Sequence, residues 1–189
     1  MKNLRILIPC ESLDGRGGTE LYVRDVAHAL LRFGHTPIVY STRPGKIATE
    51  IRNMTIPVVD SLDALAVTPD LIYGQHHLPT MTALLHFAGV PAIYVCHDWY
   101  GQNAFAPRFP RILRFVAVDV TCRDRLIYED GINESRVCLL PSFVDLNRFG
   151  QRPPLPAQPR RALVFGNYTK ENPHLSALRI CRANSCAMN

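Results

Sequence analysis

The chain has 189 residues, of which 47% are hydrophobic and 20% charged, and its formal net charge is +5. This length suggests one domain of about 150 residues, with too little left for a second of that size. No apolar stretch approaches the roughly 18 residues that span a bilayer, so the composition is typical of a soluble globular protein. The positive charge favours anionic partners: a phosphorylated ligand, an anionic membrane surface or nucleic acid.

The chain starts with a short apolar run that is broken by Pro9 and Glu11, which is not the pattern of a secretory signal, so we expect a cytoplasmic protein. Short apolar runs then alternate with amphipathic patterns. The expected strands lie at 4–9, 37–41, 56–60, 71–74, 91–97, 113–118 and 137–140. The expected helices lie at 19–33, 46–53, 79–88 and 121–129, with Gly34, Gly89 and Gly131 as stops. Apolar strands separated by helices predict an α/β fold with a doubly wound, mostly parallel, Rossmann-like sheet.

A proline-rich segment suggests a domain boundary. Residues 151–160 hold four prolines, which favours an extended, semi-rigid linker. Residues 1–150 would form the first domain. Residues 161–189 resemble the opening strand, turn and helix of a second α/β domain that stops after one unit, too little to form a core alone.

A glycine-rich turn, Gly15-Arg16-Gly17-Gly18, connects the first expected strand to the first expected helix. Such a turn presents backbone N–H groups and the positive end of a helix dipole, which suits a phosphate or carboxylate. A dinucleotide fingerprint would place its third glycine at Glu20, and the second strand ends in Ser41-Thr42-Arg43 rather than in an acid that binds ribose. These two departures argue against a nicotinamide cofactor, although a purely structural turn stays open.

Histidines follow two of the expected strands. His97 comes at the carboxyl end of one strand, where open α/β sheets bind ligands, and Asp98 beside it could orient the imidazole or cap the loop. His76 and His77 follow another strand. Because adjacent residues of an extended chain point to opposite faces, we expect no shared metal, and one of them would line a cleft.

Cysteines and basic residues carry less information. Six cysteines form no C-x-x-C pair and mostly lie within apolar runs, which predicts buried thiols. Residues 105–115 interleave arginines with aromatic residues; they could dock on anionic lipid or form a loop that leads into a buried strand. The other basic residues are scattered without an aromatic platform, so nucleic-acid binding is not expected.

The order of several segments resembles a known family. Residues 116–119, 130–132 and 137–149 match a pattern that is common in family 4 glycosyltransferases of the two-domain GT-B type, although Ser142 and Phe143 replace the usual asparagine and glycine. The loop with Gly17 and Gly18, the strand at 69–72 and the strand that ends in His97 fit the same pattern. The chain therefore resembles the amino-terminal domain of such an enzyme, followed by the start of its carboxy-terminal domain.

This resemblance implies transfer of a sugar from a nucleotide-diphosphate donor to a glycan or lipid-linked acceptor, with retention of configuration and without a cofactor or required metal. It implies that Gly17, Gly18 and Thr19 approach the donor diphosphate. His97 would face the transferred sugar as the catalytic residue. The residues assigned to the acceptor cleft are Glu20, His76, His77 and Asp98.

The resemblance also implies that the main nucleotide pocket lies in the carboxy-terminal domain, of which little is present. Asn167 stands where many relatives carry arginine. We therefore expect no or very weak turnover from residues 1–189 alone. The expected location is the cytoplasm, where peripheral contact with the inner membrane face stays open. A non-catalytic module that binds an anion or nucleotide, or that forms a homodimer, is the alternative.

Overall fold

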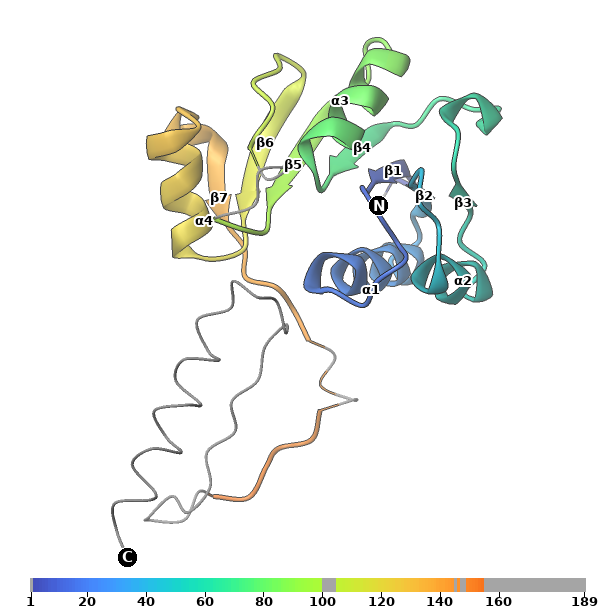
Figure 1. The fold of residues 1–189 in the computed structure, drawn as a ribbon, viewed down its shortest axis with the longest axis horizontal. Coiled ribbons are helices and arrows are strands. Elements are labelled where there is room, and N and C mark those ends of the chain that lie inside the picture. The colour runs from blue at the N-terminus through green and yellow to red at the C-terminus, as the bar shows by residue number, and fades with distance from the viewer. Residues whose placement is uncertain (1, 100–104, 145, 147–148, 155–189) are drawn as a thin grey trace, which may run out of the picture. The chain divides into compact units, whose positions relative to one another are not determined.

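The computed structural model describes residues 2–99, 105–144, 146 and 149–154 (Figure 1). The chain divides into two compact units, Met1–Phe143 and Val144–Asn189, and the helices and strands given below all belong to the first. Residues 155–160 of the expected linker and the expected start of a second domain at 161–189 lie outside the described residues.

The first unit is built on a parallel sheet with the strand order β3-β2-β1-β4-β5-β6-β7. Every strand pairing in the described residues is parallel, which confirms the predicted doubly wound α/β fold. The strands are β1 (Arg5–Pro9), β2 (Thr36–Tyr40), β3 (Val58–Val59), β4 (Leu71–Gly74), β5 (Ala92–Cys96), β6 (Ile112–Ala117) and β7 (Val137–Leu139).

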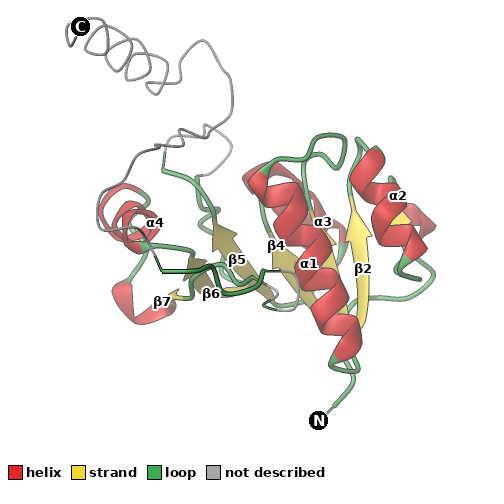
Figure 2. Ribbon diagram, turned by 90° about the horizontal axis from the view of Figure 1, so that it is seen from below, coloured by secondary structure: helices red, strands yellow, loops and turns green. Residues whose placement is uncertain are grey.

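Helices cover both faces of this sheet (Figure 2). They are α1 (Gly18–Arg32), α2 (Lys46–Asn53), α3 (His77–His86) and α4 (Val120–Asp124). Val23 of α1 and Ile47 of α2 share one buried cluster with Ile8, whereas Leu84 of α3 and Cys122 of α4 share the other with Leu7. Successive strand residues point to opposite faces, so Leu7 and Ile8 belong to different clusters. The α1–α2 face and the α3–α4 face are therefore two separate cores.

Three glycines end helical segments as the sequence predicted. Gly34, Gly89 and Gly131 have φ values of 81°, 84° and 63°. A side chain in this left-handed region clashes with its own backbone, so glycine adopts it at the least cost. These positions stop the helical turns and send the chain back to the sheet.

One helix and the burial of one cysteine differ from the sequence prediction. The helix expected at 121–129 is α4 followed by a π-helical turn, η3 (Arg125–Glu129). The wider turn lets the backbone N–H of Asp130 reach the carbonyl of Arg125 at 2.9 Å, with both side chains buried. Strand β7 lies at the sheet edge, so Cys138 is exposed, whereas Cys10, Cys96 and Cys122 are buried as predicted.

Candidate functional site

The candidate site lies at the carboxyl ends of β1, β4 and β5. The chain winds outward in one direction from β1 to β3 and in the other from β4 to β7, so the direction reverses between β1 and β4. Ligands of open α/β sheets bind outside the strand ends at this reversal. The glycine loop follows β1, Gln75 and His76 follow β4, and His97 follows β5.

Strand alternation directs Tyr73 and Gln75 toward helix α1. Tyr73 packs with the cluster on the α1–α2 face, and a period of two places Gln75 on the same side. The hydroxyl of Tyr22, on α1, lies 2.7 Å from the hydroxyl of Tyr73. The Tyr22 ring also meets the His97 ring edge-on, with centroids 4.7 Å apart. Helix α1 therefore holds His97 in place as well as presenting its own N-terminus.

Gln75 fixes the tautomer of His97. The Gln75 amide donates its Nε2–H to the Tyr73 carbonyl at 3.0 Å, which leaves its Oε1 to face His97. The distance from Oε1 to Nε2 of His97 is 2.7 Å. An amide oxygen only accepts hydrogen bonds, so Nε2 of His97 carries the hydrogen and donates it. The other ring nitrogen, Nδ1, is then an acceptor.

Both site histidines favour the neutral form. Burial, together with the neighbouring His76, lowers the pKa of His97 from 6.5 to about 4. Burial also lowers the pKa of His76, although the carboxylates of Glu11 and Glu20 favour its charged form. At pH 7 the imidazoles therefore act as hydrogen-bonding groups and contribute no positive charge to an anionic ligand.

His76 and His77 form hydrogen bonds with different segments of the chain. Nδ1 of His76 accepts the backbone N–H of Glu11 at 3.3 Å, which ties the end of β4 to the end of β1. His77 is the first residue of α3 and its Nδ1 bonds the carbonyl of Phe105 at 2.8 Å. The structure thus brings His76 to the loop after β1, but it places His77 against the segment that leads to β6.

The glycine loop is open at one position and crowded at another. Helix α1 begins at Gly18 with Gly17 as its N-cap. A Cβ atom on Gly18 would meet nothing within 4 Å, whereas a Cβ on Gly17 would lie 2.6 Å from a carboxylate oxygen of Glu20. Glu20 folds back over the loop, where its negative charge interacts favourably with the positive end of the α1 dipole. An anion can approach the first turn at Gly18, next to Thr19, but not through Gly17 unless Glu20 moves.

Arg125 is an important residue that sequence reasoning missed. Its side chain is 2% exposed, and Nη1 of its guanidinium donates to the carbonyls of Asp98 and Trp99, at 2.8 and 2.6 Å. It also lies over the Phe105 ring at 4.7 Å. The carboxylate of Asp130, 3.9 Å from Nε of Arg125, accepts the N–H of Ala106. The Arg125–Asp130 pair thus holds the backbone that follows His97. Asp98 is positioned through its backbone carbonyl, which accepts from Arg125.

The basic stretch at 105–115 also uses its arginines to hold backbone. Arg111 donates to the carbonyls of Phe87 and Val90 beyond the end of α3. Arg114 donates to Ser135 at 2.8 Å. These bonds fit the interpretation of this stretch as a loop that leads into a buried strand.

The described part of the chain shows neither a metal-binding cluster nor a membrane-spanning helix. Within it, no three His, Cys, Asp or Glu side chains come together in a way that could hold a metal ion. Its helices are all too short or too polar to cross a membrane.

Two solved glycosyltransferase structures are similar to this chain. A glycosyltransferase from Rickettsia africae ESF-5 has 18% sequence identity and a TM-score of 0.61, with 79% of this chain and 45% of that chain covered. Anabaena Alr3699/HepE, solved with UDP and glucose, has 20% identity and a TM-score of 0.58, with 80% and 48% covered. The chain thus spans about half the length of these two proteins, and the likeness establishes the fold.

The comparison with curated proteins gave no match. The family model described as Glycosyltransferase Family 4 matches residues 16–148, which is more than half of the chain. The match begins in the glycine loop and includes the strand ends that carry His76 and His97. The chain belongs to Glycosyltransferase Family 4.

Proposed function

We propose that this chain is the acceptor-side domain of an enzyme that transfers a sugar from a nucleotide-diphosphate donor to a glycan or lipid-linked acceptor, with retention and without a required metal. Family membership supports the transferase class, and the UDP and glucose bound to Anabaena HepE support a nucleotide-sugar donor. The observation that carries the proposal is the uncovered face of Gly18 at the start of α1, where the strand order reverses.

The chemistry assigns different tasks to the loop and to the histidines. Breaking the sugar–phosphate bond builds negative charge on the leaving diphosphate, and the N–H groups at the start of α1 stabilise that charge. His97 is neutral at pH 7, so its Nδ1 accepts a hydrogen bond from a sugar hydroxyl. Because Nδ1 of His76 accepts from the backbone N–H of Glu11, its proton is on Nε2. This Nε2–H donates a hydrogen bond to the substrate that receives the sugar.

Gly18→Ala separates ligand binding from folding. The methyl group has space in the unliganded protein, and alanine favours a helix, so we expect an unchanged or slightly higher melting temperature. The same methyl blocks close approach of a diphosphate. We expect the dissociation constant for UDP-glucose, measured by NMR titration of the full 189-residue chain, to rise about tenfold, equivalent to about 1.4 kcal/mol.

Gly89→Ala is the matched control. Its φ of 84° makes alanine cost about 1–2 kcal/mol of stability, and it lies beyond the end of α3, away from the loop. We expect a lower melting temperature and unchanged affinity for UDP-glucose. Equal affinities of wild type and Gly18→Ala for UDP-glucose would contradict diphosphate binding at Gly18. Robust sugar transfer by residues 1–189 alone would contradict the proposal that this chain is only the acceptor-side domain.

A further inference from the structure

A pocket lies at the opposite edge of the sheet from the glycine loop. Its volume is about 350 Å³, within the range of small-molecule sites. Two loops form it: residues 108–110 before β6, and residues 131–136 before β7. Strands β6 and β7 are parallel neighbours, so these loops meet at their amino ends.

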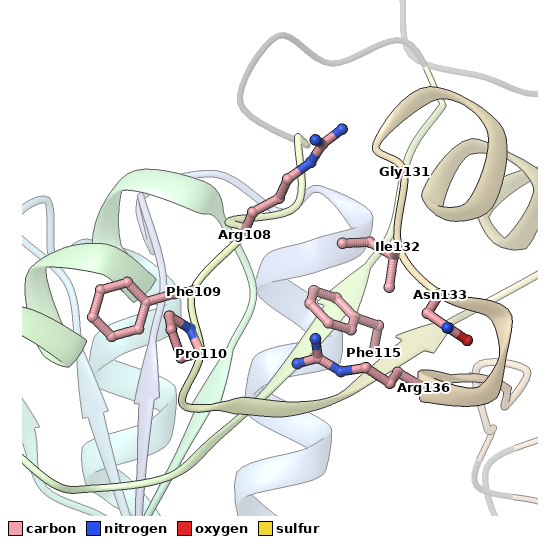
Figure 3. A pocket seen from close by; sticks show the side chains of 8 residues that line it. All are labelled: Arg108, Phe109, Pro110, Phe115, Gly131, Ile132, Asn133 and Arg136. Atoms are coloured by element: carbon pink, nitrogen blue, oxygen red, sulfur yellow. The ribbon is translucent and has the colours of Figure 1, made fainter.

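Aromatic and basic groups line this pocket together. Figure 3 shows Arg136 beside the Phe115 ring, whereas the Arg108 side chain extends away from that ring, and Phe109 and Pro110 lie along the loop before β6. The guanidinium of Arg136 lies over the Phe115 ring at 5.2 Å. The lining thus combines flat apolar surfaces, which suit the C–H face of a sugar ring, with two cations that suit an anionic group.

Both arginines are held in place by the backbone. Nε of Arg108 donates to the carbonyl of Asp130 at 2.6 Å, and Nη2 of Arg136 donates to the carbonyl of Ile112. A guanidinium has five N–H donors, so each arginine keeps others for a ligand. The nearby carboxylate of Asp130 accepts from Ala106 and faces Arg125, which keeps its charge engaged in the interior. Cations fixed in advance lose little entropy when an anion binds.

We propose that this pocket binds an anionic monosaccharide, that is, a sugar ring carrying a phosphate or carboxylate group. The ring packs on Phe109 and Pro110, and the anionic group pairs with Arg108 and Arg136. This site is separate from the strand ends proposed to hold the donor, and the proposal does not depend on the transferase function.

The test is an NMR titration of the ¹⁵N-labelled full chain with glucose 6-phosphate, inorganic phosphate and glucose. We expect saturable shifts of the Gly131, Ile132 and Asn133 amides with glucose 6-phosphate, and weaker binding of the other two compounds. Arg108→Gln removes a charge-assisted contact and should weaken binding about tenfold. Because Arg136 also holds Ile112, Arg136→Lys, which keeps the charge, is used there, with a smaller loss expected.

Arg43→Gln is the control, since Arg43 follows β2 at the carboxyl edge and pairs with Glu11. Its affinity for glucose 6-phosphate should equal that of wild type. The proposal fails if Arg108→Gln binds as wild type does, if Arg43→Gln weakens binding equally, or if phosphate alone binds as tightly as glucose 6-phosphate. Shifts confined to residues 15–18 would also overturn the pocket proposal while leaving the proposed function intact.

Discussion

At the residue scale, the pair formed by Gln75 and His97 decides what the imidazole can do. Gln75 is 2% exposed, and both ends of its amide are engaged, one by the Tyr73 carbonyl and one by His97. A group with a pKa of about 4 is a poor general base near pH 7, whereas a neutral imidazole with a fixed Nδ1 acceptor can orient a hydroxyl. This geometry favours a positioning role for His97.

Gln75→Glu should reverse the protonation preference of His97. A carboxylate beside Nε2 stabilises the imidazolium, so we expect the pKa of His97 to rise by on the order of one unit or more. Gln75→Met is the matched control: it fills the same space without a charge and should leave His97 neutral at pH 6. NMR titration of the His97 ring measures both variants, and equal midpoints in the two would refute the direct contact.

The lowered pKa of His97 also makes stability depend on pH. In the unfolded chain this group takes up a proton near its ordinary pKa of 6.5, but in the folded chain only near about 4. The unfolded state therefore binds more protons between these values, and the free energy of unfolding falls as pH drops, by up to about 3 kcal/mol from this group. Urea denaturation at pH 7 and pH 5 measures the part of this loss that falls above pH 5, about 2 kcal/mol.

His97→Asn is the variant that isolates this contribution. It removes the titrating ring, so the difference in unfolding free energy between pH 7 and pH 5 should shrink relative to wild type. An unchanged difference would mean that other groups cause the pH dependence.

At the element scale, the sequence was sufficient to predict features that depend on neighbouring residues alone, such as hydrophobic periodicity and glycine stops. Periodicity located the helices and strands, and the stops at Gly34 and Gly89 followed from the need for positive φ. The sequence could not predict the π-helical turn after α4, because that turn accommodates Arg125 and Asp130, whose partners lie more than twenty residues away in the chain. It likewise could not show that β7 is an edge strand, which exposes Cys138.

The Arg125–Asp130 pair should be essential to this part of the fold. Asp130→Ala leaves the buried guanidinium without its carboxylate and the Ala106 N–H without its acceptor, so we expect a loss of about 3–5 kcal/mol in unfolding free energy. Asp130→Asn keeps an acceptor for Ala106 and should lose less. Chemical denaturation compares the two, and equal stabilities of wild type and Asp130→Ala would show that the pair contributes nothing.

At the scale of the whole molecule, the strand order explains why scattered residues meet. Reversal between β1 and β4 brings the ends of β1, β4 and β5 together, so Glu11, His76 and His97 become neighbours although they span much of the chain. The sequence predicted that strand ends would carry the site. It missed Gln75 and Tyr22, whose importance rests on contacts between β4, β5 and α1. A polar residue directly after β4 was the available signal for Gln75.

The central claim is that the start of α1 receives a diphosphate beside a neutral His97. A crystal structure of the full chain soaked with UDP-glucose tests it most directly. We predict a phosphate oxygen within hydrogen-bonding distance of the backbone nitrogen of Gly18 or Thr19, Glu20 turned away from Gly17, and a sugar hydroxyl on Nδ1 of His97. A diphosphate bound elsewhere, with Glu20 still folded over the loop, would contradict the claim.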